Sequence, residues 1–189
     1  IQKNPVSDAF AAKAVELIAA NLPTACRNGA DTEARTSLAL ASLMAGTAFS
    51  NAMVGIVHAI GHSLGGLCRI PHGQAMMMLL PHCVRFNLDR GIHAGLYGQL
   101  LDVLAPARAA ALGAGAAPEA LDRAFLDELT ALNDLFHREY GVPLTLSELG
   151  VSRDDLPAVA KQARYDGAAL YNETEITLED AMAVLEAAY

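Results

Sequence analysis

Apolar residues recur at helical spacing along nearly the whole chain, and no long stretch alternates in the manner of a half-buried strand. The pattern predicts a first helix over 8–22, ended by Pro23, because proline disrupts a helix interior. A second helix is predicted from Thr32, with Asp31 as its N-cap, through Val54 towards a group of histidines. The chain therefore begins as two consecutive helices.

Gly65-Gly66 is expected to break the second helix, and Pro71 to restart a helix at its first position. The segment 105–118, with its alanines and glycines, is expected to be a surface connection. Thr177 followed by Asp180 indicates a capped helix start. The helices predicted after the break cover 72–88, with a bend at Pro81, and 94–104, 118–140, 153–167 and 178–189. We therefore predict an all-α fold, a multi-helix, bundle-like single domain over residues 1–189.

Composition narrows the class of protein. The chain is 53% hydrophobic and 18% charged, which suits a compact folded domain. A net charge of −8 argues against a nucleic-acid or anionic-membrane surface. The stretch between Arg35 and Arg69 carries no charge, but its serines, asparagine, histidines and five glycines favour a buried central helix over a membrane span. We expect neither nucleic acid nor membrane as a partner.

The three cysteines, Cys26, Cys68 and Cys83, contain no C-x-x-C pair, and an odd count is a poor disulfide framework. The residues before Asp8 show no signal-peptide pattern. Both observations favour a reduced, cytoplasmic setting.

Three of the six histidines, His58, His62 and His72, lie within fifteen positions. His58 and His62 are four apart and share a helix face, and a turn at Gly65-Gly66 would return His72 towards them. Three neutral imidazoles with an open position would resemble a catalytic zinc site, and a carboxylate from elsewhere would suit ferrous iron. Hydrogen-bonded core histidines are the alternative, and no Glu follows His58 as in zincins. Spacing alone leaves these readings open.

The string Gly55–Asn87 contains Gly-x-x-His-Ala-x-x-His-x-Leu-Gly-Gly, then Pro-His-Gly-x-Ala, then Leu-Leu-Pro and Phe-Asn. It closely resembles the signature of iron-containing (group III) alcohol dehydrogenases. The similarity extends over nearly the whole chain, through Asn4-Pro5-Val6-Ser7-Asp8-Ala9, Asp166-Gly167 and Thr177-Leu178-Glu179-Asp180. The chain is thereby identified with the C-terminal helical, metal-binding domain of that family.

The resemblance implies a two-domain enzyme that interconverts a small alcohol and its aldehyde or ketone with NAD or NADP. The family's divalent metal, Fe2+ or Zn2+, is held by one Asp and three His. Of these ligands, two histidines match His58 and His72 here. His62 matches a histidine near nicotinamide and substrate, a candidate for proton relay, and Phe49 matches a position lining the nicotinamide pocket. Homo-oligomers are expected, since an uncovered apolar face favours association.

Two departures bear on activity. The family's other two ligands, an Asp and a His four residues apart, are expected shortly before the segment that begins at Asn4, where this chain starts. No glycine-rich loop or strand–helix alternation of a nucleotide-binding domain is present, so that domain is expected to be missing, and with it most of the NAD(P) site. Glu173 also replaces the family's usual proline. We therefore expect a weak metal site and no activity in the chain alone.

Two alternatives belong to other classes of protein. One is a stand-alone metal-binding module, such as a carboxylate-bridged di-iron bundle, but its Glu-x-x-His pairs are absent from the sequence. The other is a non-catalytic helical scaffold whose histidines only pack or mediate self-association.

Overall fold

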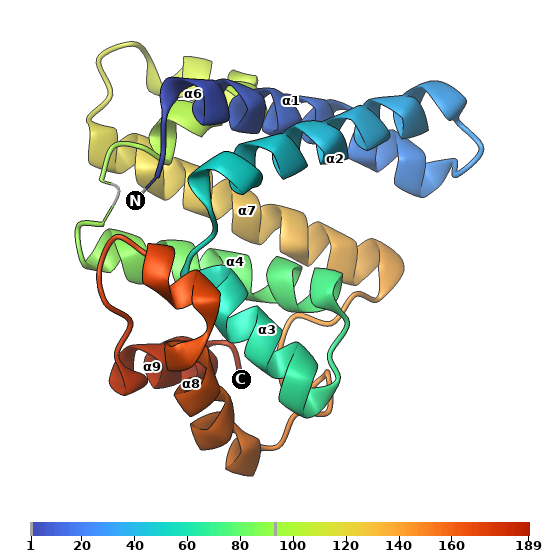
Figure 1. The fold of residues 1–189 in the computed structure, drawn as a ribbon. Helices are drawn as coiled ribbons and strands as arrows, with labels where there is room; N and C mark the ends of the chain where they lie inside the picture. Colours follow the sequence, from blue (N-terminus) through green and yellow to red (C-terminus); the bar gives the residue numbers. More distant parts are fainter. Residues whose placement is uncertain (1, 93) are drawn as a thin grey trace. The chain divides into compact units, whose positions relative to one another are not determined.

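The computed structural model describes residues 2–92 and 94–189, and all regular secondary structure among them is helical (Figure 1). The all-α prediction is confirmed. The α-helices are α1 (Pro5–Arg27), α2 (Thr32–Ala52), α3 (Ile56–Cys68), α4 (His72–Asp89), α5 (Leu101–Leu104), α6 (Pro106–Leu112), α7 (Pro118–Tyr140), α8 (Leu156–Tyr165) and α9 (Leu178–Ala187). Three 3₁₀ helices accompany them, η1 (Gly98–Leu100), η2 (Arg153–Asp155) and η3 (Gly167–Tyr171).

The described chain forms two compact units. The first contains 2–53 and 94–125, and the second contains 54–92 and 126–189. The long helix α7 contributes its first residues to the first unit and the rest to the second. The expectation of one domain over 1–189 stays a prediction.

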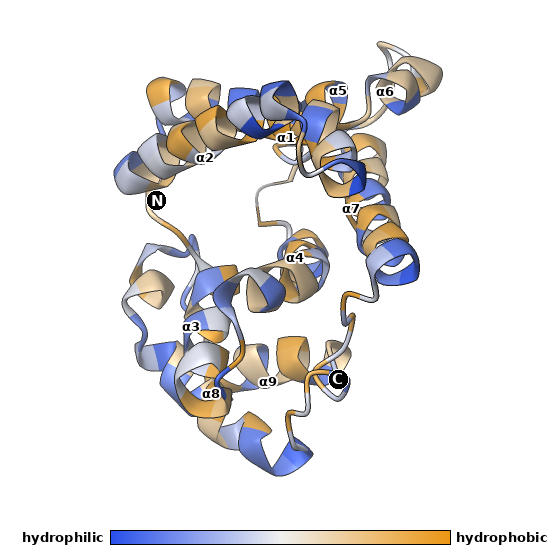
Figure 2. Cartoon of the chain, turned by 90° about the vertical axis from the view of Figure 1, so that its right-hand side faces the viewer, coloured by the Kyte–Doolittle hydropathy of each residue, from blue (hydrophilic) through white to orange (hydrophobic). Residues whose placement is uncertain are grey.

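The first unit is built on a hairpin of α1 and α2, which lie side by side (Figure 2). Asn4 begins α1, because its side-chain oxygen accepts the N–H groups of Val6 and Ser7. Asp31 begins α2 by accepting the N–H of Ala34 at 2.9 Å, so the predicted N-cap is confirmed. The buried hydrophobic residues of the two helices are small ones, Ala14, Ala34, Ala41 and Ala48. Small side chains let two helix backbones approach closely.

A buried carboxylate holds the segment before η1 against α7. Asp122 is only 2% exposed, and its two oxygens accept the N–H groups of Gly95, at 2.6 Å, and Gly98, at 2.7 Å. A Cβ on Gly98 would lie 2.5 Å from the Leu121 side chain, so this backbone passes α7 at a distance that only glycine permits. Asp122 therefore satisfies two backbone donors that the close packing removes from water.

The second unit is organised around α3. Its residues Ile56, Ile60 and Leu64 repeat every four positions and are fully or almost fully buried. They belong to one core cluster with residues of α4, α8 and α9, including Leu79, Val159, Ala160, Ala163 and Leu185. Figure 1 shows α3 beside α8. Burial of each large aliphatic side chain contributes roughly 1.5–3 kcal/mol before entropy is counted.

The start of α3 depends on a residue more than a hundred positions away. Gly55 is its N-cap and offers no side chain, so the first N–H groups of the helix need another acceptor. The side-chain oxygen of buried Asn172 accepts the N–H of Ile56 at 3.2 Å, and its amide nitrogen donates to the Thr174 carbonyl at 3.1 Å. Asn172 thus caps α3 from the segment after η3.

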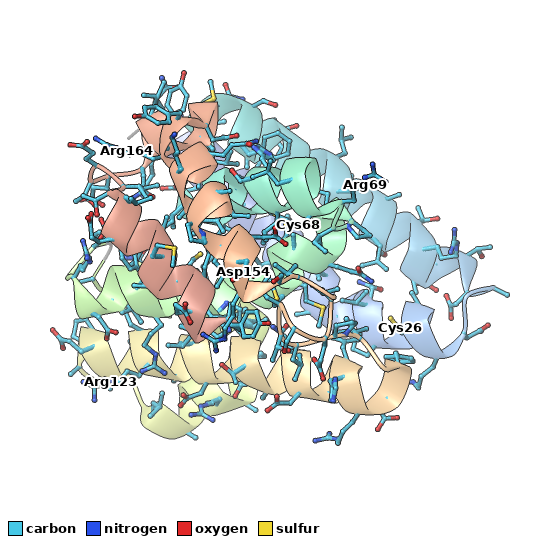
Figure 3. All side chains as sticks on the ribbon, turned by 90° about the horizontal axis from the view of Figure 1, so that it is seen from below. Cys26, Cys68, Arg69, Arg123, Asp154 and Arg164 are labelled. Carbon is cyan, nitrogen blue, oxygen red and sulfur yellow. The ribbon has the colours of Figure 1, made fainter. Side chains whose placement is uncertain are left out.

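The opposite end of α3 lies beside the beginning of α8. Figure 3 labels Cys68 and Arg69 at the end of α3 and Asp154 just before α8. Burial raises the pKa of the Cys68 thiol, and the nearby negative charge of Asp155 raises it further. Since Asn172 meets the start of α3 and Asp155 its end, α3 runs antiparallel to the segment from η2 to η3.

Two expectations about helix ends, and one about a surface connection, are wrong. Pro23 lies inside α1, which continues to Arg27, because packing along α2 outweighs the bond that proline removes. The second helix does not run into the histidines but ends at Ala52, and Met53 has a positive φ of 64°. The segment 105–118 is not wholly a connection, because it contains α6.

The turn before His72 is also placed differently. Gly65 and Gly66 remain helical in α3, and a Cβ on Gly66 would lie 3.3 Å from the Gln162 side chain of α8. The helix ends instead at Arg69, which adopts the left-handed conformation with φ 59°. Pro71 is the N-cap of α4 rather than its first residue. Gly66 therefore serves the close contact with α8, and Arg69 reverses the chain.

Within the part of the chain that the structure describes, no single helix is both long and apolar enough to span a membrane. The consecutive helices α2 and α3 meet the criteria of length and composition only when counted together.

Replacing Asp122 tests the two hydrogen bonds by which its carboxylate holds Gly95 and Gly98 against α7, called the clamp below. Asp122→Ala leaves one buried and one half-buried N–H group without an acceptor, and we expect it to lower the free energy of unfolding by about 2–5 kcal/mol. Asp122→Asn keeps one acceptor and should lose less. Urea titration followed by circular dichroism measures both. Asp134→Ala, an exposed acid on the same helix, is the control and should change stability by no more than about 0.5 kcal/mol; an equal loss in the control would contradict the clamp.

Two glycine substitutions should act with opposite signs in the second unit. A Cβ on Gly55 would lie 2.7 Å from the Asn172 oxygen, whereas a Cβ on Gly73 in α4 meets nothing within 4 Å. We expect Gly55→Ala to displace the Asn172 side chain and cost about 1–3 kcal/mol. Gly73→Ala should stabilise the helix by about 0.5–1 kcal/mol. Thermal and urea unfolding of the two variants measures the difference, and equal effects would contradict the proposed cap.

Candidate functional site

The structure brings His58, His62 and His72 together. Residues two positions apart on a helix point roughly 200° apart, so His58 and His62 lie on the side of α3 away from buried Ile56 and Ile60. The ring centroids of His58 and His62 are 5.5 Å apart, and those of His58 and His72 are also 5.5 Å apart. His62 and His72 stack with centroids 5.8 Å apart. The chain reversal at Arg69 thus returns His72 to the other two histidines, as had been expected of a turn at Gly65-Gly66.

His58 is the most enclosed member of the cluster. Burial lowers its pKa below the ordinary histidine value, and the neighbouring His62 and His72 lower it further, while Asp166 acts weakly in the opposite direction. His58 is therefore held neutral at neutral pH, the state in which an imidazole can bind a metal ion. Because the unfolded chain binds this proton more tightly, falling pH through the histidine range favours unfolding.

Asp166 is a member of the site that the sequence analysis named only within the family resemblance and not as a site residue. Its carboxylate lies beside His62, with Nδ1 at 3.2 Å from Oδ1 and 3.3 Å from Oδ2. The Asp166 side chain is only 20% exposed, against 44% for His62. A separation of more than a hundred residues leaves no local pattern by which spacing could have found this pair.

Phe49, the residue matched to a nicotinamide pocket, lies in the last turn of α2 and belongs to the first unit. Its side chain is 52% exposed, which is high for an aromatic residue. Two more exposed apolar residues lie on the same helix, Leu40, which is 49% exposed, and Leu43, which is 67% exposed. The three histidines, by contrast, belong to the second unit.

The histidine cluster is compatible with part of a metal site. Two imidazoles bound to one ion at about 2.1 Å in tetrahedral geometry have ring centroids roughly 5 Å apart, close to the separation of His58 and His72. Among residues 2–92 and 94–189, however, no three His, Cys, Asp or Glu side chains are placed to hold an ion together. The donor set therefore fits two ligands of such a site and needs others to complete it.

A cavity of about 230 Å³ lies elsewhere in the second unit, between α4 and α7. None of the three clustered histidines lines it. Burial and the charge of Arg85 lower the pKa of His82 on its wall. The lining residues are Met78, Pro81, His82, Arg85, Leu126, Thr130, Asn133, Asp134 and Leu144.

Comparison with known proteins places the chain in a family. The family model described as Fe-containing alcohol dehydrogenase family, C-terminal, matches residues 1–189. Alcohol dehydrogenase 4 of Saccharomyces cerevisiae is 35% identical over 186 residues, covering 98% of this chain and 45% of the relative. The 1,3-propanediol dehydrogenase of Klebsiella pneumoniae is 38% identical over 191 residues, again covering 98% and 45%.

The solved structures agree with the sequences. A crystal structure of a 1,3-propanediol oxidoreductase superposes with a TM-score of 0.87 at 34% identity, covering all of this chain and 46% of that one. This chain thus spans about half the length of the curated relatives that it matches. Sequence and fold together show that the chain belongs to the iron-containing alcohol dehydrogenase family and corresponds to its C-terminal, helical part.

Proposed function

We propose that this chain is the metal- and substrate-binding part of an NAD- or NADP-dependent alcohol dehydrogenase that interconverts an alcohol and its aldehyde or ketone. The observation that carries the proposal is the gathering of His58, His62 and His72 around one point in a chain of this family. Relatives named alcohol dehydrogenase and 1,3-propanediol dehydrogenase support a small alcohol or aldehyde as substrate.

His58 and His72 are proposed as two ligands of a divalent ion, Fe2+ or Zn2+. The lowered pKa of His58 supports this role, because a neutral imidazole needs no deprotonation before it binds. Such an ion would polarise the alcohol oxygen and stabilise its alkoxide form. The remaining ligands are proposed to come from outside these 189 residues, in line with the 45% coverage of the relatives.

His62 is proposed as the group that exchanges the hydroxyl proton. It lies beside both proposed ligands, and its exposed side chain can reach a substrate at the surface of this unit. A nicotinamide, bound mainly by a separate nucleotide-binding domain, would accept the hydride. Phe49 is proposed to contact that nicotinamide through its exposed ring. Self-association and a cytoplasmic setting stay predictions from the sequence.

A non-catalytic helical scaffold is the second candidate for the isolated polypeptide. It is favoured by one observation, the lack of a three-residue ligand group within the described residues. A scaffold would have no use for two imidazoles 5.5 Å apart, and it would bind no metal through them. Metal binding therefore separates the two proposals.

Titration calorimetry with zinc tests the ligand pair. We expect the wild-type chain to bind Zn2+ weakly, and His58→Ala or His72→Ala to lower the affinity by at least about 10-fold, because each removes one of two bonds. His137→Gln is the matched control, since His137 hydrogen-bonds the Val142 carbonyl at 2.9 Å and lies outside the cluster. A wild-type chain without affinity for zinc, or equal binding by the double variant, would sink the proposal in favour of the scaffold.

The 189-residue polypeptide by itself is expected to oxidise no alcohol. It carries two proposed ligands, and its described residues form no strand–helix nucleotide-binding fold. The assay follows NADH or NADPH formation from short alcohols with added ferrous or zinc ion. A protein that joins this chain to a family nucleotide-binding domain is the positive control, and clear turnover by the 189 residues alone would refute the prediction.

A further inference from the structure

The carboxylate of Asp166 is fixed before it meets His62. Asp166 ends α8 and is the N-cap of η3, with an extended backbone at φ −66° and ψ 144°. Its Oδ1 accepts the N–H of Ala168 at 2.8 Å. That bond sets the side-chain direction locally, independently of the histidine. The Asp166 carboxylate is therefore oriented by its own backbone segment, and the His62 ring lies against it.

The contact dictates which ring nitrogen of His62 carries the proton. A carboxylate only accepts hydrogen bonds, so Nδ1 of His62 must be the donor at 3.2 Å from Oδ1. In a neutral imidazole with a proton on Nδ1, the lone pair is on Nε2. Nε2 is then the nitrogen left to accept from another partner. Without the carboxylate, an imidazole in water favours the opposite form, with the proton on Nε2.

We propose that Asp166 is a positioning residue that holds His62 in the Nδ1–H form and thereby makes Nε2 the atom that meets the substrate hydroxyl. This inference rests on the proposed function, in which His62 exchanges a proton with the alcohol. In that step the O–H bond would break and an Nε2–H bond would form, while the C–H bond at the carbinol carbon would break and its hydride would pass to a bound nicotinamide. The Asp166 carboxylate then faces the imidazolium that results.

A purely structural role is the competing explanation, because the same contact joins α3 to the end of α8. Asp166→Asn separates the two. Asparagine is as good an N-cap as aspartate, so its oxygen can keep the Ala168 N–H while its NH2 group turns to His62. The NH2 group takes the place of Oδ2, 3.3 Å from Nδ1 of His62, and donates, which favours an Nδ1 that accepts, while Oδ1 at 3.2 Å stays an acceptor. The variant preserves the local structure and shifts the proton towards Nε2. Asp166→Ser keeps a capping oxygen but is too short to reach the ring.

Nuclear magnetic resonance reads the proton position directly. Long-range 1H–15N correlation spectra of the 15N-histidine-labelled chain are recorded well above the ordinary pKa of histidine, with His62→Gln to assign the signals. We expect the Nδ1–H form in the wild type, the Nε2–H form in Asp166→Asn, and a shift towards Nε2–H in Asp166→Ser. An Nε2–H ring in the wild type, or no change in Asp166→Asn, overturns the proposal. This measurement needs neither metal nor cofactor, so it is independent of the zinc titration that tests the proposed function.

Steady-state kinetics of the protein that joins this chain to a family nucleotide-binding domain test the consequence for catalysis. Asp166→Asn should lower kcat by about 10²–10⁴-fold, the range of a lost general base, with little change in KM. Zinc affinity of the same variant should stay within about 3-fold of the wild type, since Asp166 is not a proposed ligand. A kcat that stays at the wild-type level, with the proton position inverted, overturns the positioning role. Failure of zinc to bind the wild type with the Nδ1–H form intact would count against the proposed function alone.

Discussion

The hydrogen bond from the Ile56 N–H to the Asn172 oxygen fixes where the histidine-bearing helix begins. Gly55 cannot cap α3 itself, and its missing Cβ leaves the space that the Asn172 side chain occupies. The rotation of α3 about its axis then follows from the buried series Ile56, Ile60 and Leu64. Once start and rotation are fixed, His58 and His62 have no freedom to face elsewhere. The geometry of the site is thus a consequence of a cap supplied from the far end of the chain.

The sequence predicts the elements of this fold well wherever local chemistry decides them. Asp31 and the Thr177–Asp180 pair begin helices as expected, and 118–140 is a helix to the residue. It fails where packing between helices decides. Pro23 stays in a helix because the next helix, α2, packs along it, and Gly66 stays helical beside Gln162 of α8. A local signal does not report contacts with another helix, whether that helix follows at once or nearly a hundred residues later.

The same division applies to the site. His58, His62 and His72 could be singled out because they are close in sequence and all titratable. Asp166 and Asn172 could not, because each meets α3 across more than a hundred residues and belongs to a common residue type for turns. Only the resemblance marked that region at all. The candidate histidines are thus readable from the sequence here, whereas the residues that contact and position them require the fold.

The antiparallel course of α3 and the segment from α8 to η3 has a consequence for how this protein tolerates insertions and deletions. Asp166 contacts α3 at His62, and Asn172 contacts it at Ile56. The two contacts are six residues apart in α3 and also six residues apart in the segment that pairs with it. The loops of the chain that joins the end of α3 to α8 can change length without altering which residues of α3 meet Asp166 and Asn172. A single residue added between 166 and 172 would leave only one of the two contacts in place. Natural variation in length should therefore accumulate in the loops and be absent from residues 166–172.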